Sequence, residues 1–158
     1  MSVFVIGGTG FIGLRLIRAL AARGERVVCM DINPAAHSFE DIGEQVDVVA
    51  GDLTKFDDVM GNMAAAEPER VINLSYMLGS LHAPRSAMNL NILGMDNCFE
   101  AARIVGAKRV VYASSLAVYG LQSHYGERAV TEEDFRHGND QYSMHKIFNE
   151  WQAADYID

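Results

Sequence analysis

Tyr142 and Lys146, near the end of the sequence, are spaced for proton transfer. Residues four apart share one face of a helix, so both side chains can act at one site. An isolated tyrosine titrates near pH ~10, and a nearby ammonium lowers that pKa by favouring the phenolate. Because an acid or base works best with a pKa near the operating pH, the pair makes sense as a proton-transfer device. The alternative is a pair of surface side chains on an amphipathic helix.

Ser115 is the third candidate for this chemistry. It follows a predicted strand over residues 108–113, and parallel sheets present ligand-binding residues at the carboxyl ends of their strands. Its hydroxyl can hold the substrate oxygen that gains or loses the proton.

A glycine-rich turn stands between a predicted buried strand over 3–6 and a predicted helix over 11–22. Two registers fit it: Gly8, Gly10 and Gly13 spell G-x-G-x-x-G, and Gly7, Gly10 and Gly13 spell G-x-x-G-x-x-G. Glycines let the backbone approach a pyrophosphate closely, and a helix N-terminus offers free N–H groups and the positive end of its dipole. The order strand, glycines, helix favours dinucleotide binding, with a purely structural turn as the alternative.

Two acidic residues follow later strands. Asp31 lies 18 residues after Gly13, the distance at which a carboxylate can bind the adenosine ribose hydroxyls. Such a carboxylate repels a 2′-phosphate, so NAD is favoured over NADP; the alternative is a turn aspartate before Asn33. Asp52 can accept from the adenine amino group, or it can help start the next helix with Thr54 as N-cap, and both readings stay open.

Strands and helices are predicted to alternate along the whole chain. This alternation predicts an α/β fold, a Rossmann-type doubly wound parallel sheet of strand order 3-2-1-4-5 in a three-layer αβα arrangement. Residues 77–87 are expected to form a loop over the site, and 32–45 to be irregular with a short helical turn. The predicted strands are 3–6, 26–30, 46–50, 69–74 and 108–113, and the predicted helices are 11–22, 56–63, 87–105 and 139–156.

Length and composition exclude several classes of protein. With 158 residues, 49% of them hydrophobic, the chain is expected to form one domain, 1–158. A net charge of −8 without a basic stripe argues against nucleic acid and anionic membranes as partners. Cys29 and Cys98 are predicted to be reduced core thiols, and the histidines lack ligand spacing, so no metal site is expected. No membrane span or signal peptide is visible, so a cytoplasmic protein is expected.

Taken together, the motifs resemble the extended short-chain dehydrogenases/reductases, and among them the NAD-dependent epimerase/dehydratase group that includes UDP-glucose 4-epimerase. The resemblance covers nearly the whole chain and is more specific for the family than for the substrate. It rests on 7–13 (GGTGFIG), Asp31, 51–53 (GDL), 91–94 (NILG), 114–120 (SSLAVYG) and 142–146 (YSMHK) with Glu150.

The resemblance implies a role for each matching residue. Ser115 matches the catalytic Ser/Thr position, Tyr142 the acid/base and Lys146 its partner. Asp31 would bind the adenosine ribose, and Asn91 matches a helix asparagine near the nicotinamide. The remaining NAD-binding residues would be Gly7, Gly10, Phe11, Ile12 and Gly13 at the glycine turn, Asp52 with Leu53 at the adenine end, and Tyr142 with Lys146 at the nicotinamide end. The helices over 87–105 and 139–156 resemble the pair that forms a four-helix homodimer interface.

The chain also departs from the family pattern. Leu116 and Ala117 stand where the dehydratases carry an Asp-Glu pair, so elimination of water is disfavoured. Gln141 and His145 replace a frequent proline and a frequent serine, both tolerable. Family members are about twice as long by domain arithmetic, so we expect an amino-terminal portion that lacks the substrate-binding part and has an open edge at strand five. The alternative is a protein that another chain completes.

The resulting expectation is an NAD-dependent epimerase-type enzyme acting on a small molecule, a nucleotide sugar by family frequency. A dehydrogenase or reductase of the same family on another hydroxyl or carbonyl substrate is the first alternative, because both chemistries need the same residues. A non-catalytic NAD-binding module is the second. The intact Ser115, Tyr142 and Lys146 argue against it, and the short length argues for it.

Overall fold

A five-stranded parallel sheet forms the centre of the computed structural model, which describes residues 2–78 and 83–156. The strand order is β3-β2-β1-β4-β5, so the predicted fold class and order are confirmed. In this order the strands are β3 (Val46–Ala50), β2 (Arg26–Asp31), β1 (Ser2–Ile6), β4 (Arg70–Asn73) and β5 (Arg109–Tyr112). Each lies within two residues of its predicted bounds.

The register aligns the carboxyl ends of the four strands β2, β1, β4 and β5. Ile6 of β1 is paired with Met30 of β2 and with Asn73 of β4, and Asn73 is paired with Tyr112 of β5. The residues that follow this row therefore leave the sheet at one edge. That edge is where ligands bind in open parallel sheets.

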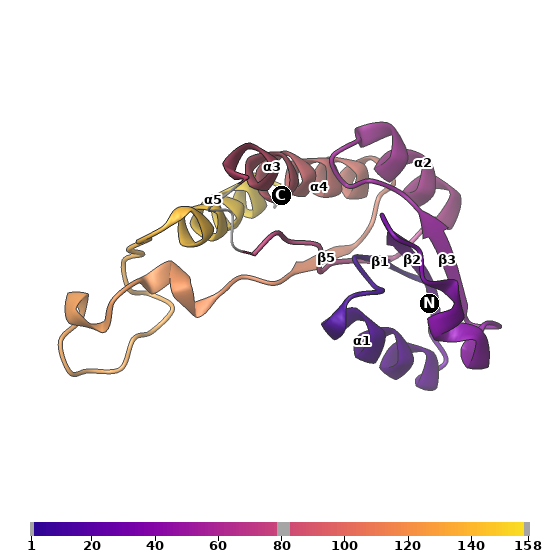
Figure 1. The fold of residues 1–158 in the computed structure, drawn as a ribbon, viewed down its shortest axis with the longest axis horizontal. Coiled ribbons are helices and arrows are strands. Elements are labelled where there is room, and N and C mark those ends of the chain that lie inside the picture. Colours follow the sequence, from indigo (N-terminus) through magenta and orange to yellow (C-terminus); the bar gives the residue numbers. More distant parts are fainter. Residues whose placement is uncertain (1, 79–82, 157–158) are drawn as a thin grey trace.

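Helices cover both faces of the sheet (Figure 1). α1 (Phe11–Ala22) lies on one face, and α2 (Phe56–Ala66) and α4 (Gly94–Ile104) lie on the other. The side chains of β1 alternate accordingly. Phe4 and Ile6 belong to the cluster under α2 and α4, while Val3 and Val5 belong to the cluster under α1. A parallel strand buried on both faces reads as a continuous apolar run, which is why β1 is recognisable in the sequence.

The connections on either side of β3 match their predictions except at one cap. The segment predicted as irregular holds a 3-10 helix, Ala36–Ile42, whose Phe39 is buried. α2 begins at Phe56 with Lys55 at the N-cap, so the prediction of Thr54 as N-cap is wrong. Thr54 instead donates to the Asp52 carboxylate, and Asp57 and Asp58 supply negative charge to the first turn of α2.

The long helix predicted over 87–105 starts earlier and is not uniform. Helix α3 (Pro84–Met88) begins inside the predicted 77–87 loop, because proline suits the first turn of a helix; residues 79–82 of that loop lie outside the described residues. A π-helical segment, Asn89–Leu93, joins α3 to α4. π-helical turns inside helices frequently mark functional sites.

Helix α5 (Gln141–Asp155) has its polar residues inside and its apolar residues outside. A capping box between Asp140 and Ser143 begins it. Its buried residues are Ser143, His145, Lys146, Asn149 and Gln152, whereas Met144, Phe148 and Trp151 are more than half exposed. Hydrogen bonds therefore hold α5 in place. None of the described helices is long and apolar enough to cross a membrane.

Asn149→Ala tests this polar docking. Asn149 Nδ2 donates to the Asn91 carbonyl of the π-helical segment at 2.8 Å, and Gln152 Nε2 donates to the Ile92 carbonyl at 3.2 Å. Removing the amide leaves a buried carbonyl without its donor, so we expect a loss of about 1–3 kcal/mol in the free energy of unfolding. Urea unfolding measures it. The exposed Asn89→Ala is the control and should change stability by less than about 0.5 kcal/mol; equal effects of the two variants would contradict this account.

Candidate active site

The turn after β1 needs glycine for two separate reasons. Gly7 has φ +76°, and a Cβ there would lie 2.8 Å from the main-chain nitrogen of Ser75. A Cβ on Gly13 would lie 2.4 Å from the Gly8 carbonyl oxygen, so the first turn of α1 is pressed against the glycine turn. A Cβ on Gly8 would meet Cys29 Sγ at 2.5 Å. Gly7, Gly8 and Gly13 of the two sequence registers therefore lie where the turn packs too closely against its surroundings to admit a side chain.

The N-terminus of α1 is free to receive an anion. Its N-cap, Gly10, has no side chain that could accept from the first turn, and no acidic residue lies in that turn. The first N–H groups of a helix have no partner within the helix, and such groups with the positive dipole end form an anion site. Phe11 and Ile12 are 79% and 60% exposed here. These residues fit a pyrophosphate.

Asp31 is both a turn residue and an available acceptor. Its Oδ1 accepts from Asn33 N at 3.1 Å, which is the predicted turn alternative, and its Oδ2 accepts from Thr9 N at 3.2 Å. Asp31 thus connects β2 to the glycine turn. Each carboxylate oxygen retains a second lone pair for a ribose hydroxyl.

Asp52 and Leu53 lie just beyond β3, and both already form hydrogen bonds within the protein. Asp52 Oδ1 accepts from the nitrogen and hydroxyl of Thr54 at 2.9 and 2.8 Å, and Asp52 N donates to Asp58 at 3.0 Å. Leu53 is 3% exposed within the core, and its carbonyl accepts from Asn97 at 2.9 Å. Leu53 can meet a ligand only through its main chain.

Lys146 is buried beside Tyr142, so the alternative of two surface side chains does not hold for this lysine. It is 3% exposed, and its Nζ donates to the Ala113 carbonyl at 2.5 Å. Nζ lies 5.8 Å from the ring centroid of Tyr142, which is half-buried. Burial lowers the pKa of Lys146 to about 8. Lys146 Nζ is therefore near the Tyr142 ring, and the pKa of this lysine lies nearer to neutrality than that of an exposed lysine.

Ser115 lies three residues beyond β5 and begins the 3-10 helix Leu116–Tyr119. Its Oγ accepts from Ala117 N at 3.2 Å, so its own hydrogen remains available to a substrate oxygen. The hydrogen bond from Lys146 to Ala113 ties α5 to the strand end two residues before this serine. Ser114 adds a second tie, donating to Glu150 of α5 at 2.6 Å.

Asn91 faces the protein main chain. It is 1% exposed; its Oδ1 accepts from Met77 N at 2.8 Å and its Nδ2 donates to Met77 O at 3.1 Å. Its Nδ2 also lies 3.3 Å from His145 Nδ1. Burial lowers the pKa of His145, which favours the neutral ring that such an acceptor requires. The structure thus places Asn91 as a support for the segment after β4.

Tyr76 is the side chain at this site to which the sequence analysis assigned no role. Its ring lies with its centroid 3.3 Å from Lys146 Nζ, and it meets the Tyr142 ring edge-on with centroids 5.6 Å apart. The available signal was its position, three residues past β4 at the ligand edge of the sheet. No motif marks it.

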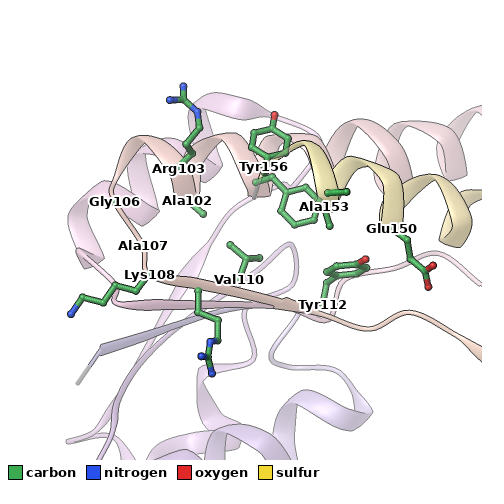
Figure 2. A pocket seen from close by; sticks show the side chains of 13 residues that line it. Ala102, Arg103, Gly106, Ala107, Lys108, Val110, Tyr112, Glu150, Ala153 and Tyr156 are labelled. Carbon is green, nitrogen blue, oxygen red and sulfur yellow. The ribbon is translucent and has the colours of Figure 1, made fainter. Parts of the chain in front are cut away.

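A separate groove of about 820 Å³ runs along the open edge of the sheet, between β5, α4 and α5 (Figure 2). Among the described strands β5 pairs with β4 alone, so the predicted open edge is confirmed. The groove is lined by Val110 and Tyr112 of β5, by Ala153 of α5, and by Tyr156 at the C-cap of α5. None of the predicted site residues lines it, so this groove is distinct from the candidate site.

Comparisons with known proteins agree with this geometry. A model of the NAD dependent epimerase/dehydratase family matches residues 3–158. UDP-glucose 4-epimerase 3 of Oryza sativa subsp. japonica is 27% identical over 98% of this chain and 45% of its own length. The NAD complex of UDP-glucose 4-epimerase from Thermus thermophilus superposes with a TM-score of 0.84, at 28% identity over 99% of this chain and 50% of that one.

A third relative extends the similarity to a complex with a sugar nucleotide. UDP-glucose-4-epimerase from Stenotrophomonas maltophila, solved with NAD and formylated UDP-arabinopyranose, has a TM-score of 0.85 at 27% identity, over 98% of this chain and 48% of that one. The chain spans about half the length of the relatives it matches. Because the family model covers nearly every residue from the first strand to α5, the chain belongs to the NAD dependent epimerase/dehydratase family.

Proposed function

We propose that this chain is the NAD-binding, catalytic part of an epimerase that acts on a nucleotide sugar. The observation that carries the proposal is the buried Lys146 ammonium beside Tyr142, at the sheet edge where the glycine turn and Asp31 also lie. Domain 1–158 would then bind the cofactor and supply the reacting side chains. NAD supplies hydride acceptance and return when bound.

Each residue has a defined task in this proposal. The N–H groups at the start of α1 bind the pyrophosphate, and Asp31 accepts from the adenosine ribose. Ser115 donates to the substrate oxygen and orients it. Tyr142 takes the proton from the substrate hydroxyl, and the Lys146 ammonium stabilises the phenolate that forms before transfer. Leu116 and Ala117 provide no acid or base, which disfavours elimination of water.

A dehydrogenase or reductase acting on another hydroxyl or carbonyl substrate is the second candidate. It needs the same three side chains, and Short-chain dehydrogenase/reductase family 42E member 1 of Bos taurus is 32% identical over 74% of this chain. The epimerase is favoured because the relatives named above carry that name. Turnover of UDP-glucose without net NADH supports epimerisation, whereas stoichiometric NADH would favour this second candidate.

A homodimer is proposed from the outer face of the two long helices. Met144, Phe148 and Trp151 of α5 are 53%, 51% and 72% exposed. Met88 and Leu93, on the neighbouring α3 and π-helical segment, are 50% and 55% exposed. Apolar side chains that gather on adjacent helices favour burial against another protein surface. A second copy fits, because it presents the same apolar face.

We also propose a reducing, cytoplasmic setting. Cys29 and Cys98 are both free and both buried in the core. Burial raises the pKa of each thiol to about 12, so both stay protonated and unreactive. Unpaired core thiols are typical of proteins kept in reducing compartments.

Tyr142→Phe tests the catalytic assignment. Phenylalanine keeps the ring and removes the transferable proton, so in a protein of full family length that carries this chain we expect turnover of UDP-glucose to fall by about 10²–10⁴-fold. NAD affinity should stay within about twofold, because the proposed cofactor contacts at the glycine turn are unchanged. Tyr112→Phe, in the separate groove, is the control and should retain full activity. Equal activity of Tyr142→Phe and wild type would remove Tyr142 from the mechanism.

Asp31→Asn tests the cofactor assignment. The wild-type carboxylate should repel a 2′-phosphate, so NAD should bind more tightly than NADP. Neutralising it should reduce that preference by about tenfold in the ratio of dissociation constants. Calorimetric titration with both dinucleotides measures the ratio. Asp47→Asn, the same charge change near the opposite end of the sheet, should leave the ratio unaltered. A preference for NADP in the wild type would contradict the role of Asp31.

Phe148→Glu tests the homodimer. A charge in the centre of the exposed α5 face would have to be desolvated on association, so we expect the variant to sediment as a monomer at concentrations where the wild type is dimeric. Leu121→Glu, at an exposed position outside the helices, should leave the dimer intact. Monomeric wild-type protein at all concentrations would rule out the homodimer.

A further inference from the structure

Tyr76 lies between two anchored residues of the segment that follows β4. Before it, Ser75 N donates to Asn73 Oδ1 at 3.0 Å. After it, both main-chain groups of Met77 are hydrogen-bonded by the Asn91 amide. Asn73 and Asn91 are 2% and 1% exposed, so neither amide is free to move away. The main chain around Tyr76 is therefore fixed from both sides.

The face of the Tyr76 ring points toward the Lys146 ammonium, and the ring also forms a T-shaped pair with the Tyr142 ring. Lys146 Nζ lies 3.3 Å from the Tyr76 ring centroid, within the range of a cation–π contact. The Tyr76 and Tyr142 rings meet at 85° with centroids 5.6 Å apart. One ring thus contacts both members of the proposed proton-transfer pair.

We propose that Tyr76 is a positioning residue that holds the Lys146 ammonium beside Tyr142 through its ring. The proposal rests on the roles given to Tyr142 and Lys146 above and adds a third side chain to them. Tyr76 moves no proton itself. It acts by fixing where the ammonium sits and by favouring its charged form.

The hydroxyl of Tyr76 plays no part in this contact. It is buried and has no hydrogen-bond partner among the described residues. Burial raises the pKa of Tyr76, so the phenol stays neutral and offers no negative oxygen to the lysine. What remains is the attraction between the ammonium and the negative face of the aromatic ring.

The lysine has few other means of compensating its burial. Its ammonium has three N–H donors, and the Ala113 carbonyl accepts one of them. Among the described residues no carboxylate forms an ion pair with it, whereas the lysine at 108 pairs with Glu69. A buried charge without a counter-ion needs other stabilisation, and the ring supplies it. A donor remains for Tyr142 or for a ligand hydroxyl.

The consequence for the site concerns the charge on Lys146. Desolvation lowers its pKa, and the ring face opposes that effect because it interacts favourably only with the ammonium. Without the ring, more of the lysine would be neutral at a given pH. Less positive charge would then lie beside the Tyr142 ring.

Proton NMR of the lysine ε-methylene groups tests the proposal in the ligand-free chain. The sequence contains three lysines, and Lys55 and Lys108 are exposed and serve as internal references. Assignment of the Lys146 signal follows from its loss in Lys146→Met. We expect this signal to lie upfield of the other two, because a proton over an aromatic face is shielded, and to titrate at lower pH.

Two substitutions of Tyr76 separate the ring from the hydroxyl. Tyr76→Phe keeps the ring, so the Lys146 signal and titration midpoint should match the wild type. It should also unfold at the same or a higher temperature, because an unpartnered buried hydroxyl is removed. Tyr76→Leu keeps the apolar surroundings and removes the ring. The upfield shift should vanish, and the midpoint should fall by about one pH unit.

Several outcomes overturn the proposal. A wild-type Lys146 signal without the upfield shift would do so, even if Tyr76→Leu did not fold. An unchanged midpoint in folded Tyr76→Leu, or equal changes in the Phe and Leu variants, would also do so. The experiment uses neither NAD nor substrate. Failure of the proposed function, tested by Tyr142→Phe turnover, is therefore distinguishable from failure of this positioning role.

Discussion

Burial of one ammonium, that of Lys146, links the sheet to the helix that completes the candidate site. A buried charge is costly unless it is compensated, and the groups that compensate it come from different elements. The Ala113 carbonyl lies just beyond β5, and the Tyr76 ring lies beyond β4. The lysine itself is on α5. Docking of α5 and assembly of the site are therefore the same event, since displacing α5 would strip the ammonium of both contacts.

The inverted polarity of α5 follows from this requirement. A helix that delivers a tyrosine and a lysine to a ligand edge cannot present a purely apolar face to the protein. Hydrogen bonds attach α5 to the protein instead, and main-chain carbonyls of the π-helical segment Asn89–Leu93 accept from Asn149 and Gln152. The same segment carries Asn91, which holds Met77 in place. One irregular turn of helix thus supports both α5 and the main chain next to Tyr76.

The sheet and its order could be predicted because burial on both faces leaves a plain signal in the sequence. Residues 3–6 of β1 and 27–30 of β2 are continuous apolar runs, and alternation with helices dictates parallel pairing. The glycine turn and Asp31 could also be predicted from the sequence. A close approach of two backbone segments admits only glycine, and the number of residues between the glycine turn and the acidic residue is characteristic. These features are local in sequence, so residue type and spacing determine them.

The remainder of the site depends on contacts between distant segments. Tyr76 and Lys146 are 70 positions apart, and nothing in either neighbourhood announces a cation–π contact. The start of α3 at Pro84 was not predicted, because residues 77–87 were interpreted as a loop. The π-helical turn was not predicted, because helical periodicity does not distinguish a π-helical turn from an α-helical one. The buried residues of α5 are polar, so apolar periodicity does not mark them. That periodicity marks Met144, Phe148 and Trp151, which are more than half exposed.

That outer stripe gives the proposed dimer a role beyond association. In a helix held by hydrogen bonds, the apolar surface contributes nothing to docking while it faces water, because only removal from water yields free energy. A second copy that covers Phe148 and Trp151 would add this missing contribution on the side opposite Lys146. The same helix would then be restrained from both faces, by polar contacts toward the sheet and by apolar contacts toward the partner. Subunit association and the position of Tyr142 would thereby be coupled through the rigidity of α5.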